Sequence, residues 1–281
     1  MPQADADEYV RVSTPERTLW VSTLRVSTPV ESDRTLNIAH RGASAAAPPN
    51  TLAAFKKAVE LGADGIEFDV HFSADGIPVV IHDFTVDVTT DGSGRVADLT
   101  LAQLKQLDAG TRFDPAFTGE RIPTLDEVLE AVSGRRGWGG ELLLNVELKT
   151  TSLGDNGLER AVITLVEQHS LSRRVLFSSF NPFSLRRAKS IAPHIPVGLL
   201  YDQGLSLPLR RAWLAFLAPH EARHPHYKMV DARYMTWARQ RGYRVNTWTV
   251  DDPGEMRRLV GLGVNGIITN VPDVLRSVLE S

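Results

Sequence analysis

The chain has 281 residues, 42% of them hydrophobic, with no cysteine and a formal net charge of −3. This composition excludes disulfide bonds and thiolate metal sites, and it lacks the basic surface of a nucleic-acid-binding protein. No stretch is long and apolar enough for a transmembrane helix, and the polar N-terminus lacks the apolar core of a signal peptide. We therefore expect a cytoplasmic protein that binds no nucleic acid and does not insert stably into a membrane.

Residues 1–34 differ from the rest of the chain. The sequence Arg-Val-Ser-Thr-Pro occurs at 11–15 and again at 25–29, within a segment rich in Ser, Thr and Arg. Such a short polar segment cannot form a core of its own. We expect an N-terminal arm that is extended, paired as two strands or flexible, followed by one domain over residues 35–281.

From residue 36 onward, short apolar segments alternate with helical patterns. The predicted strands span 36–40, 65–70, 142–148, 174–179, 196–200, 222–227, 243–249 and 265–269. The predicted helices span 51–61, 124–132, 156–169, 183–190, 207–217, 231–241, 254–261 and 272–279. Eight strand–helix units in succession predict a closed α/β barrel of the TIM (β/α)8 type. An open doubly wound sheet is the alternative, but no glycine-rich dinucleotide-binding turn follows the first strand.

Residues 71–122 interrupt this alternation after the second strand. They contain a hairpin arm, a Gly- and Thr-rich loop and a helical piece at 100–107. We expect a small inserted subdomain here, because insertions at the carboxyl ends of barrel strands commonly build active sites.

Two carboxylates, Glu67 and Asp69, share one face of the second strand, since side chains alternate along a strand. A turn centred on Asp75-Gly76 would place His82 opposite Asp69, and a shift by one residue would place it opposite Glu67. The apolar residues expected on the other face are Ile66, Phe68, Val70, Val79 and Ile81. The sequence thus indicates either a cation site with a nearby acid–base group or an ordinary half-exposed hairpin.

A third carboxylate, Glu147, ends the next predicted barrel strand. The carboxyl ends of barrel strands share one face, so Glu147 is expected near Glu67 and Asp69. Three carboxylate ligands suit one hard divalent cation, Mg²⁺ or Ca²⁺. An exposed ion pair between Glu147 and Lys149 is the alternative for this strand end.

Further polar and aromatic candidates lie at the ends of other strands. His40 and His82 would form an acid–base pair, with a purely structural strand-end role as the alternative for His40. Arg41 and Lys149 would attract an anionic substrate, most naturally a phosphate. Trp248 is interpreted either as core packing or as part of a substrate-binding wall.

The remaining histidines receive structural interpretations. His71 shares the face of Asp69, and we expect it to be a hydrogen-bonded scaffold residue rather than a ligand. His220, His224 and His226 lack regular metal-ligand spacing and are expected on the loop and strand surface.

After residue 35 the chain resembles the glycerophosphodiester phosphodiesterase family. The motifs that carry this resemblance are Ala39-His-Arg-Gly42, Asn50-Thr-Leu-Ala-Ala-Phe55, Glu67-x-Asp69, Pro78-Val-Val-Ile-His-Asp83, Thr89-Thr-Asp-Gly-Ser-Gly94, Ile122-Pro-Thr-Leu125, Val146-Glu-Leu-Lys149, Ser178-Ser-Phe180, Trp248-Thr-Val and Gly266-Ile-Ile-Thr269. The resemblance implies a TIM barrel with a small inserted subdomain. The site residues it implies are the metal ligands Glu67, Asp69 and Glu147, the catalytic His40 and His82, and the phosphate-site residues Arg41 and Lys149.

Four positions depart from the family's usual pattern. Pro49 replaces a glutamate that helps to order the site near the metal. Asn270-Val271 stands where Asp-Arg is common, Phe84 replaces a proline, and Val88 replaces an arginine. We expect the last three departures to alter substrate selection or loop shape more than chemistry.

The expected reaction is metal-dependent hydrolysis of a small glycerophosphodiester to glycerol 3-phosphate and an alcohol. One alternative is a lysophospholipase D-like enzyme, which would need an apolar mouth such as Phe84, Phe113 and Phe117 could provide. The other is a catalytically silent phosphate-binding barrel, for which Pro49 is the best support.

Overall fold

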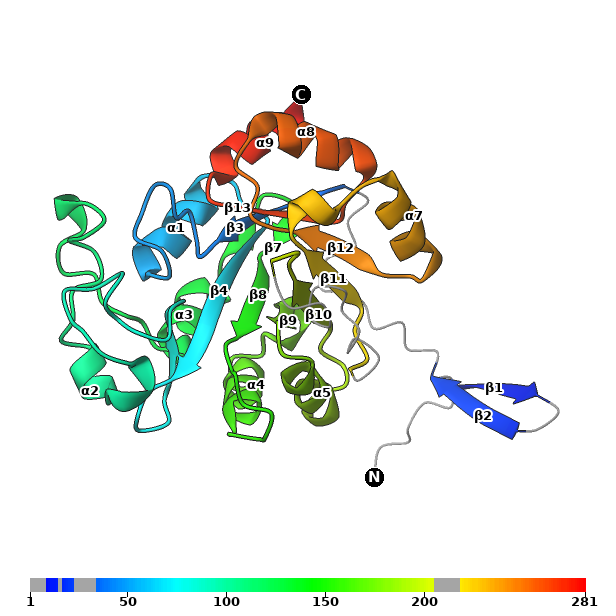
Figure 1. The fold of residues 1–281 in the computed structure, drawn as a ribbon, viewed down its shortest axis with the longest axis horizontal. Coiled ribbons are helices and arrows are strands. Elements are labelled where there is room, and N and C mark those ends of the chain that lie inside the picture. Colours follow the sequence, from blue (N-terminus) through cyan, green and yellow to red (C-terminus); the bar gives the residue numbers. More distant parts are fainter. Residues whose placement is uncertain (1–8, 15–16, 23–33, 205–217) are drawn as a thin grey trace.

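A closed barrel of eight parallel strands forms the centre of the computed structural model, which describes residues 9–14, 17–22, 34–204 and 218–281 (Figure 1). The barrel strands are β3 (Leu36–His40), β4 (Gly65–Phe72), β8 (Leu143–Leu148), β9 (Val175–Ser179), β10 (Val197–Tyr201), β11 (Ala222–Pro225), β12 (Arg244–Thr247) and β13 (Gly266–Thr269). The barrel closes because β3 pairs with both β13 and β4. The predicted TIM barrel is therefore confirmed.

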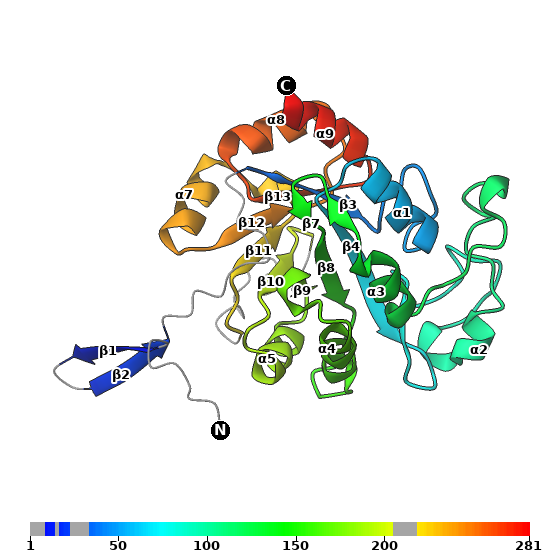
Figure 2. The same cartoon turned by 180° about the vertical axis from the view of Figure 1, so that it is seen from behind.

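Helices surround the strands on the outside of the barrel (Figures 1 and 2). They are α1 (Leu52–Glu60), α3 (Leu125–Ser133), α4 (Leu158–Gln168), α5 (Pro182–Ile191), α7 (Ala232–Gln240), α8 (Pro253–Leu262) and α9 (Pro272–Glu280). The start of α3 is fixed by a capping box in which Thr124 accepts a hydrogen bond from Glu127 N and the Glu127 side chain accepts one from Thr124 N. Each of these helices was predicted, and the predicted helix at 207–217 lies outside the described residues.

Alternation along the strands divides the side chains between two cores. Side chains that face outward pack against the helices in the largest apolar cluster, which includes Phe55, Phe68 and Phe177. A smaller cluster inside the barrel contains Leu143 and Leu176, with the other members Leu36, Ile38, Ala222 and Ile268. Residues two positions further along these strands share the inward face, so polar side chains lie above this apolar layer.

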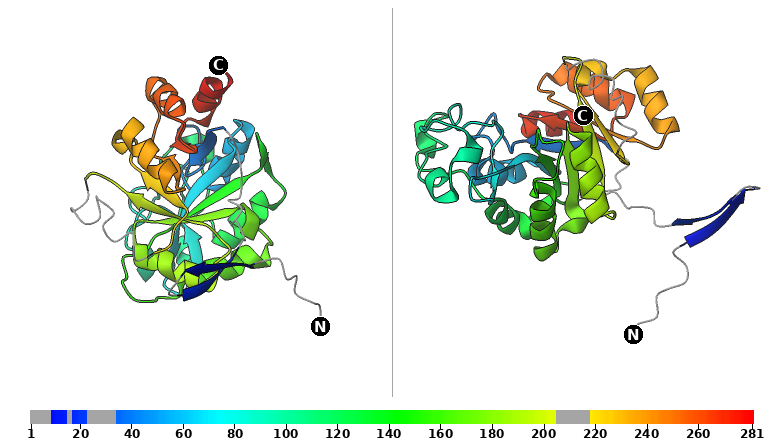
Figure 3. Two further views of the ribbon diagram at one scale, coloured as in Figure 1. Left: turned by 90° about the vertical axis from the view of Figure 1, so that its right-hand side faces the viewer. Right: turned by 60° about the horizontal axis from the view of Figure 1, so that its bottom comes forward.

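An inserted segment follows β4 and lies on the opposite side of the barrel from α7 (Figures 1 and 3). It contains the strand β5 (Pro78–Val80), the one-turn helices η1 (Val96–Asp98), α2 (Leu101–Leu104) and η2 (Pro115–Phe117), and a small apolar core. The predicted insertion after the second strand is confirmed. Shorter elements elsewhere are the hairpin of β6 (Arg136–Gly137) and β7 (Gly140–Glu141), and the helical turns η3 (Ser172–Arg174) and η5 (Tyr227–Met229).

The pairing of β4 with β5 corrects both predicted registers. Val70 pairs with Val80, and the Ile81 amide donates to the carbonyl oxygen of Asp69 at 3.1 Å, so no carboxylate pairs directly with His82. The reason is a three-residue turn at 74–76, which is closed by a hydrogen bond from Ser73 N to Ile77 O. An odd-length turn gives the register midway between the two that a two-residue turn allows.

The same register changes the expected apolar face. Val70 and Val80 belong to the main core, whereas Val79 and Ile81 belong to the core of the insertion. The prediction that Val79 and Ile81 share the face of Ile66 was wrong, because the insertion supplies a second apolar surface on the other side of the arm.

Near the N-terminus, β1 (Tyr9–Thr14) and β2 (Arg17–Ser22) form an antiparallel pair. This corresponds to the strand-pair alternative for the N-terminal segment. Throughout the described parts of the chain, every helix is too short or too polar to cross a bilayer.

Candidate active site

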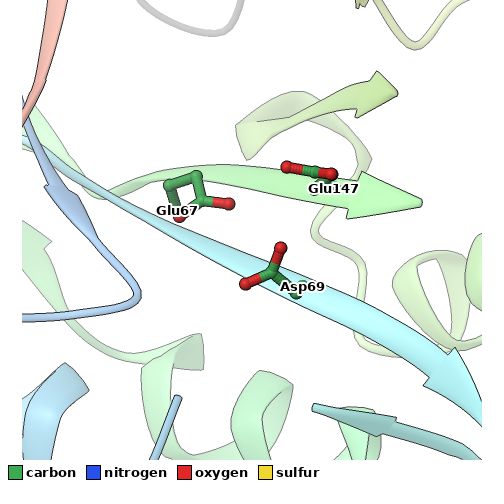
Figure 4. A group of neighbouring side chains, drawn as sticks. All are labelled: Glu67, Asp69 and Glu147. Carbon is green, nitrogen blue, oxygen red and sulfur yellow. The ribbon is translucent and has the colours of Figure 1, made fainter. Parts of the chain in front are cut away.

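Three carboxylates from two neighbouring strands lie close together (Figure 4). Glu67 and Asp69 lie on β4, and Asp69 is the Cα partner of Glu147 on β8. One carboxylate oxygen from each residue lies within 4.8 Å of the others, and the three residues are only 4%, 1% and 8% exposed. The predicted ligands therefore converge, and three buried oxygen donors at this separation fit a hard divalent cation.

Burial and the neighbouring charges give the three carboxylates different pKa values. Burial, reinforced by Asp69, raises the pKa of Glu147 to about 7, and the same causes raise the pKa of Glu67 well above its ordinary value. Burial also acts to raise the pKa of Asp69, but Lys149 and Arg41 lower it to about 2. One carboxylate thus stays ionised, while the two glutamates carry a penalty that a cation would relieve.

Two basic side chains lie against the triad. Lys149 Nζ lies 2.9 Å from Glu147 Oε1 and 3.4 Å from Asp69 Oδ1, and these carboxylates raise its pKa against the opposing effect of burial. Arg41 Nε lies 3.6 Å from Asp69 Oδ2 but has no hydrogen-bond partner among the described residues, although it is buried. The ion pair proposed as the alternative for Glu147 and Lys149 exists, but it is buried within the site rather than exposed.

Two residues of the loop after β3 donate hydrogen bonds to the carboxylates. Arg41 adopts a left-handed conformation with φ of +56°, which brings its amide to 3.0 Å from Glu67 Oε2. Asn50, with φ of +61°, donates its Nδ2 hydrogen to Asp69 Oδ2 at 2.9 Å. Sequence reasoning did not assign a site role to Asn50, because Asn50-Thr51 indicated only the start of a helix.

His40 is held by a chain of polar contacts at the end of β3. Its Nδ1 lies 2.8 Å from Asn270 Oδ1, and Asn270 Nδ2 donates to Asp251 Oδ2 at 2.6 Å. Ser44 Oγ also donates to Asn270 Oδ1 at 2.7 Å. Burial and Arg41 lower the pKa of His40 to about 4. Asn270 was expected to affect substrate selection or loop shape more than chemistry, yet it contacts a catalytic candidate directly.

His82 has a carboxylate partner of its own. Its Nδ1 lies 2.7 Å from Asp83 Oδ1, and its carbonyl oxygen lies 3.0 Å from His71 Nε2. Burial lowers the pKa of His82, and the carboxylates of Asp69 and Asp83 oppose that shift. His71 stacks edge-on against Phe84 at 4.8 Å between ring centroids, so its position fits the expected scaffold role.

A cavity of about 350 Å³ joins these groups. It is lined by His40, Arg41, Glu67, His82, Asn145, Glu147, Lys149, Ser178, Phe180, Leu200, Trp248, Thr249 and Ile268. Trp248 donates its indole hydrogen to the carbonyl oxygen of His224 at 2.8 Å, so it offers the cavity only its ring. Phe180 packs edge-on against Trp248, and both rings line the cavity.

Of the three histidines that were expected on the surface on and beside β11, one is buried. His224 is fully buried, and burial lowers its pKa to about 3. Its ring faces the barrel interior, where Asn246 Nδ2 lies 3.1 Å from its Nε2. His220 and His226 are partly exposed. The surface expectation for His224 was wrong, because alternation on β11 turns this position inward.

The chain matches the model of the Glycerophosphoryl diester phosphodiesterase family over residues 40–274. A glycerophosphodiester phosphodiesterase from Caldanaerobacter subterraneus subsp. tengcongensis is 44% identical over 247 residues, which cover 88% of this chain and 98% of that protein. An Oleispira antarctica phosphodiesterase, solved in complex with the product sn-glycerol-3-phosphate, has 35% identity and a TM-score of 0.76, covering 87% of this chain and 96% of that one. A glycerophosphodiester phosphodiesterase structure from Agrobacterium tumefaciens has 30% identity and a TM-score of 0.71, covering 86% and 99%. The chain therefore belongs to the glycerophosphoryl diester phosphodiesterase family and is a phosphoric diester hydrolase.

Proposed function

We propose that this protein hydrolyses glycerophosphodiesters to glycerol 3-phosphate and an alcohol, with the help of one divalent cation, Mg²⁺ or Ca²⁺. The observation that carries the proposal is the convergence of two histidines, two basic side chains and the carboxylates of Glu67 and Glu147 on one cavity, with Asp69 completing the carboxylate group within 4.8 Å. The product bound to the Oleispira antarctica relative supports the same substrate class.

The cation would be held by the carboxylates of Glu67, Asp69 and Glu147. Their mutual separation and the raised pKa values of both glutamates fit a group that neutralises negative charge. When bound, a cation of this kind stabilises charge that develops on phosphate oxygens.

Arg41 and Lys149 supply the positive charge for the substrate phosphate. Arg41 Nε is buried without a hydrogen-bond partner among the described residues, so a phosphate oxygen would satisfy it. Lys149 lies between Glu147 and Asp69 and stays protonated, because both carboxylates raise its pKa.

The contacts of the two histidines favour different roles for them. Asn270 must donate its amide hydrogens to Asp251, so its Oδ1 faces His40 and accepts the Nδ1 hydrogen. His40 Nε2 then carries a lone pair and accepts a proton from the nucleophile, which is water or a neighbouring substrate hydroxyl. His82 Nδ1 donates to Asp83, whose carboxylate partly offsets the lowering of the His82 pKa by burial, and the protonated ring would give its Nε2 proton to the leaving alkoxide.

The direct test measures glycerol 3-phosphate release from glycerophosphocholine with a coupled glycerol 3-phosphate assay. We expect turnover by the wild type and none by Glu67→Gln, Asp69→Asn or Glu147→Gln, each with its circular dichroism spectrum unchanged, because removing a charged ligand weakens a hard-cation site. A wild type that binds glycerol 3-phosphate but releases none would favour the silent phosphate-binding barrel.

The lysophospholipase D-like alternative requires an apolar mouth on the cavity. Phe84 and Phe113 are 48% and 40% exposed, but neither they nor Phe117 lines the 350 Å³ cavity. We therefore expect glycerophosphocholine to be preferred over lysophosphatidylcholine. Faster hydrolysis of lysophosphatidylcholine in the same assay series would reverse this preference and assign the lipid substrate.

A further inference from the structure

Two neutral polar side chains that line the cavity have no role in the proposed chemistry. Asn145 on β8 and Ser178 on β9 both line the cavity, and they are 1% and 0% exposed. Asn145 Oδ1 and Ser178 Oγ are buried and have no hydrogen-bond partner among the described residues. Buried polar atoms are nearly always satisfied by protein, water or ligand, so this pair indicates a missing partner.

The neighbouring serine shows that the strand can satisfy a hydroxyl group when it faces the other way. Ser179 Oγ donates to the carbonyl oxygen of Leu148 at 2.8 Å and accepts a hydrogen bond from Asn181 N at 3.1 Å. Ser178, one residue earlier, faces the cavity instead. The unsatisfied atom is thus specific to the side of β9 that a substrate would contact.

The strand register places both side chains beside the carboxylate triad. Asn145 precedes Glu147 by two residues on the same face of β8 and is the Cα partner of Glu67. Ser178 is the Cα partner of Glu147. Asn145 therefore lies one layer deeper than Glu147, towards the apolar layer that fills the rest of the barrel.

The adjoining wall is apolar and cannot replace the missing hydrogen bonds. Leu200 and Ile268 also line the cavity, and the indole hydrogen of Trp248 is already donated to a backbone carbonyl. A ligand that fits here needs carbon atoms on one side and a hydroxyl group on the other. Asn145 and Ser178 each offer a donor and an acceptor without charge, which suits an alcohol rather than an anion.

We propose that Asn145 and Ser178 form a polyol subsite that binds the terminal hydroxyl of the substrate's glycerol unit. This inference rests on the proposed function, which puts the phosphate at Arg41 and Lys149. The free end of the glycerol unit is then the part that reaches furthest into the barrel. The subsite selects glycerol over an alkyl group, because an alkyl group leaves both buried polar atoms unpaired.

The test compares glycerophosphocholine with an analogue that has a methyl group in place of the terminal CH₂OH group. The analogue keeps the hydroxyl next to the phosphate ester, so the reacting groups are unchanged. We expect wild-type kcat/KM to favour the glycerol substrate by about 10- to 100-fold, the factor that corresponds to leaving one buried polar group unpaired. In Ser178→Ala and Asn145→Ala, this ratio should fall towards one, mainly through the loss on the glycerol substrate.

Ser179→Ala is the matched control, since it removes the same atom from the next residue of β9. It should keep the wild-type discrimination ratio even where it lowers stability. A ratio in Ser178→Ala and Asn145→Ala equal to that of the wild type would overturn the subsite, and it would mean that these atoms pair only with water.

Calorimetric titration separates failure of the subsite from failure of the proposed function. A wild type that hydrolyses neither diester contradicts the proposed function, yet its binding of glycerol 3-phosphate and propane-1,2-diol phosphate can still be measured. Tighter binding of glycerol 3-phosphate, lost in Ser178→Ala and kept in Ser179→Ala, supports the subsite. Equal binding of the two phosphates contradicts it.

Discussion

The protonation of the carboxylate triad couples metal binding to pH. Glu67 and Glu147 have raised pKa values, that of Glu147 being about 7, whereas Asp69 is ionised above a pH of about 2. A cation held by these carboxylates would have to displace the protons of the two glutamates. We therefore expect the metal-free site to hold protons near neutral pH that metal binding would release.

We predict that the apparent affinity for Mg²⁺ or Ca²⁺ rises as the pH rises from about 5 to about 8. The sign follows from competition, because protons occupy Glu147 below its pKa of about 7 and leave it above that value. Titration calorimetry in buffers of different ionisation enthalpy measures both the affinity and the protons released. An affinity independent of pH, with no proton release, would show that the glutamates are already ionised.

The separate roles proposed for His40 and His82 predict different sensitivities to the leaving group. Each alanine variant should lower turnover of glycerophosphocholine by roughly 10²–10⁴-fold. With a nitrophenyl ester, whose leaving group needs no proton, His82→Ala should recover much of its activity and His40→Ala should not. Equal losses on both substrates would mean that the assignment of base and acid is incorrect.

Among individual residues, the charged side chains of the site could be predicted from the sequence, but the amide side chains that contact them could not. His40 and Asn270 are 230 residues apart, and they meet only because β3 and β13 are adjacent in the closed barrel. Asn50 was recognised as part of a helix start, yet its side chain binds Asp69. Charge and strand alternation predict which residues are functional, whereas hydrogen-bond partners depend on three-dimensional closure.

The strands and helices were predictable because their hydrophobic periods are distinct and their ends carry caps. The register of β4 with β5 was not predictable, because an Asp-Gly turn signal does not fix the number of residues in the turn. The insertion also provides its own apolar core, so Ile81 is buried on a face that was expected to be polar.

The close packing of β10 against β11 leaves no room for a side chain at Gly198. A Cβ atom at this position would lie 2.5 Å from Nε2 of the buried His224. We predict that Gly198→Ala lowers the free energy of unfolding by about 1–3 kcal/mol, the usual cost of overpacking. Gly261→Ala on the exposed side of α8 is the control; a Cβ atom there meets nothing within 4 Å, so a gain of up to about 1 kcal/mol is expected. Urea denaturation measures both, and an unchanged midpoint for Gly198→Ala would show that His224 can move aside.

For the molecule as a whole, barrel closure brings together residues from both ends of the domain. The site draws on β3 at the start, on β4 and β8, and on the loop after β13 at the end. The N-terminal segment contributes no candidate catalytic group. Its last residue, Arg34, does contact the barrel: Nη1 and Nη2 donate to Asp64 at 2.8 and 2.5 Å, and the guanidinium lies 4.5 Å from the Trp138 ring centroid.

Two truncated variants distinguish the effect of removing the N-terminal arm from the effect of losing the Arg34–Asp64 contact. Removal of residues 1–33 should leave both activity and stability nearly unchanged. Removal of residues 1–34 should leave activity similar but lower stability by about 1–2 kcal/mol, because the buried Asp64 carboxylate loses its charged donor. Thermal unfolding and the coupled assay decide between them, and a loss of activity on removing 1–33 would give the arm a catalytic role.

The central claim is that a divalent cation at Glu67, Asp69 and Glu147 is required for phosphodiester hydrolysis. The most direct measurement is the rate of glycerol 3-phosphate release from glycerophosphocholine after exhaustive chelation, with the residual metal content determined, followed by addition of Mg²⁺ or Ca²⁺. We expect activity to disappear on chelation and to return with one of these ions. Full activity in protein shown to be free of metal would contradict the account.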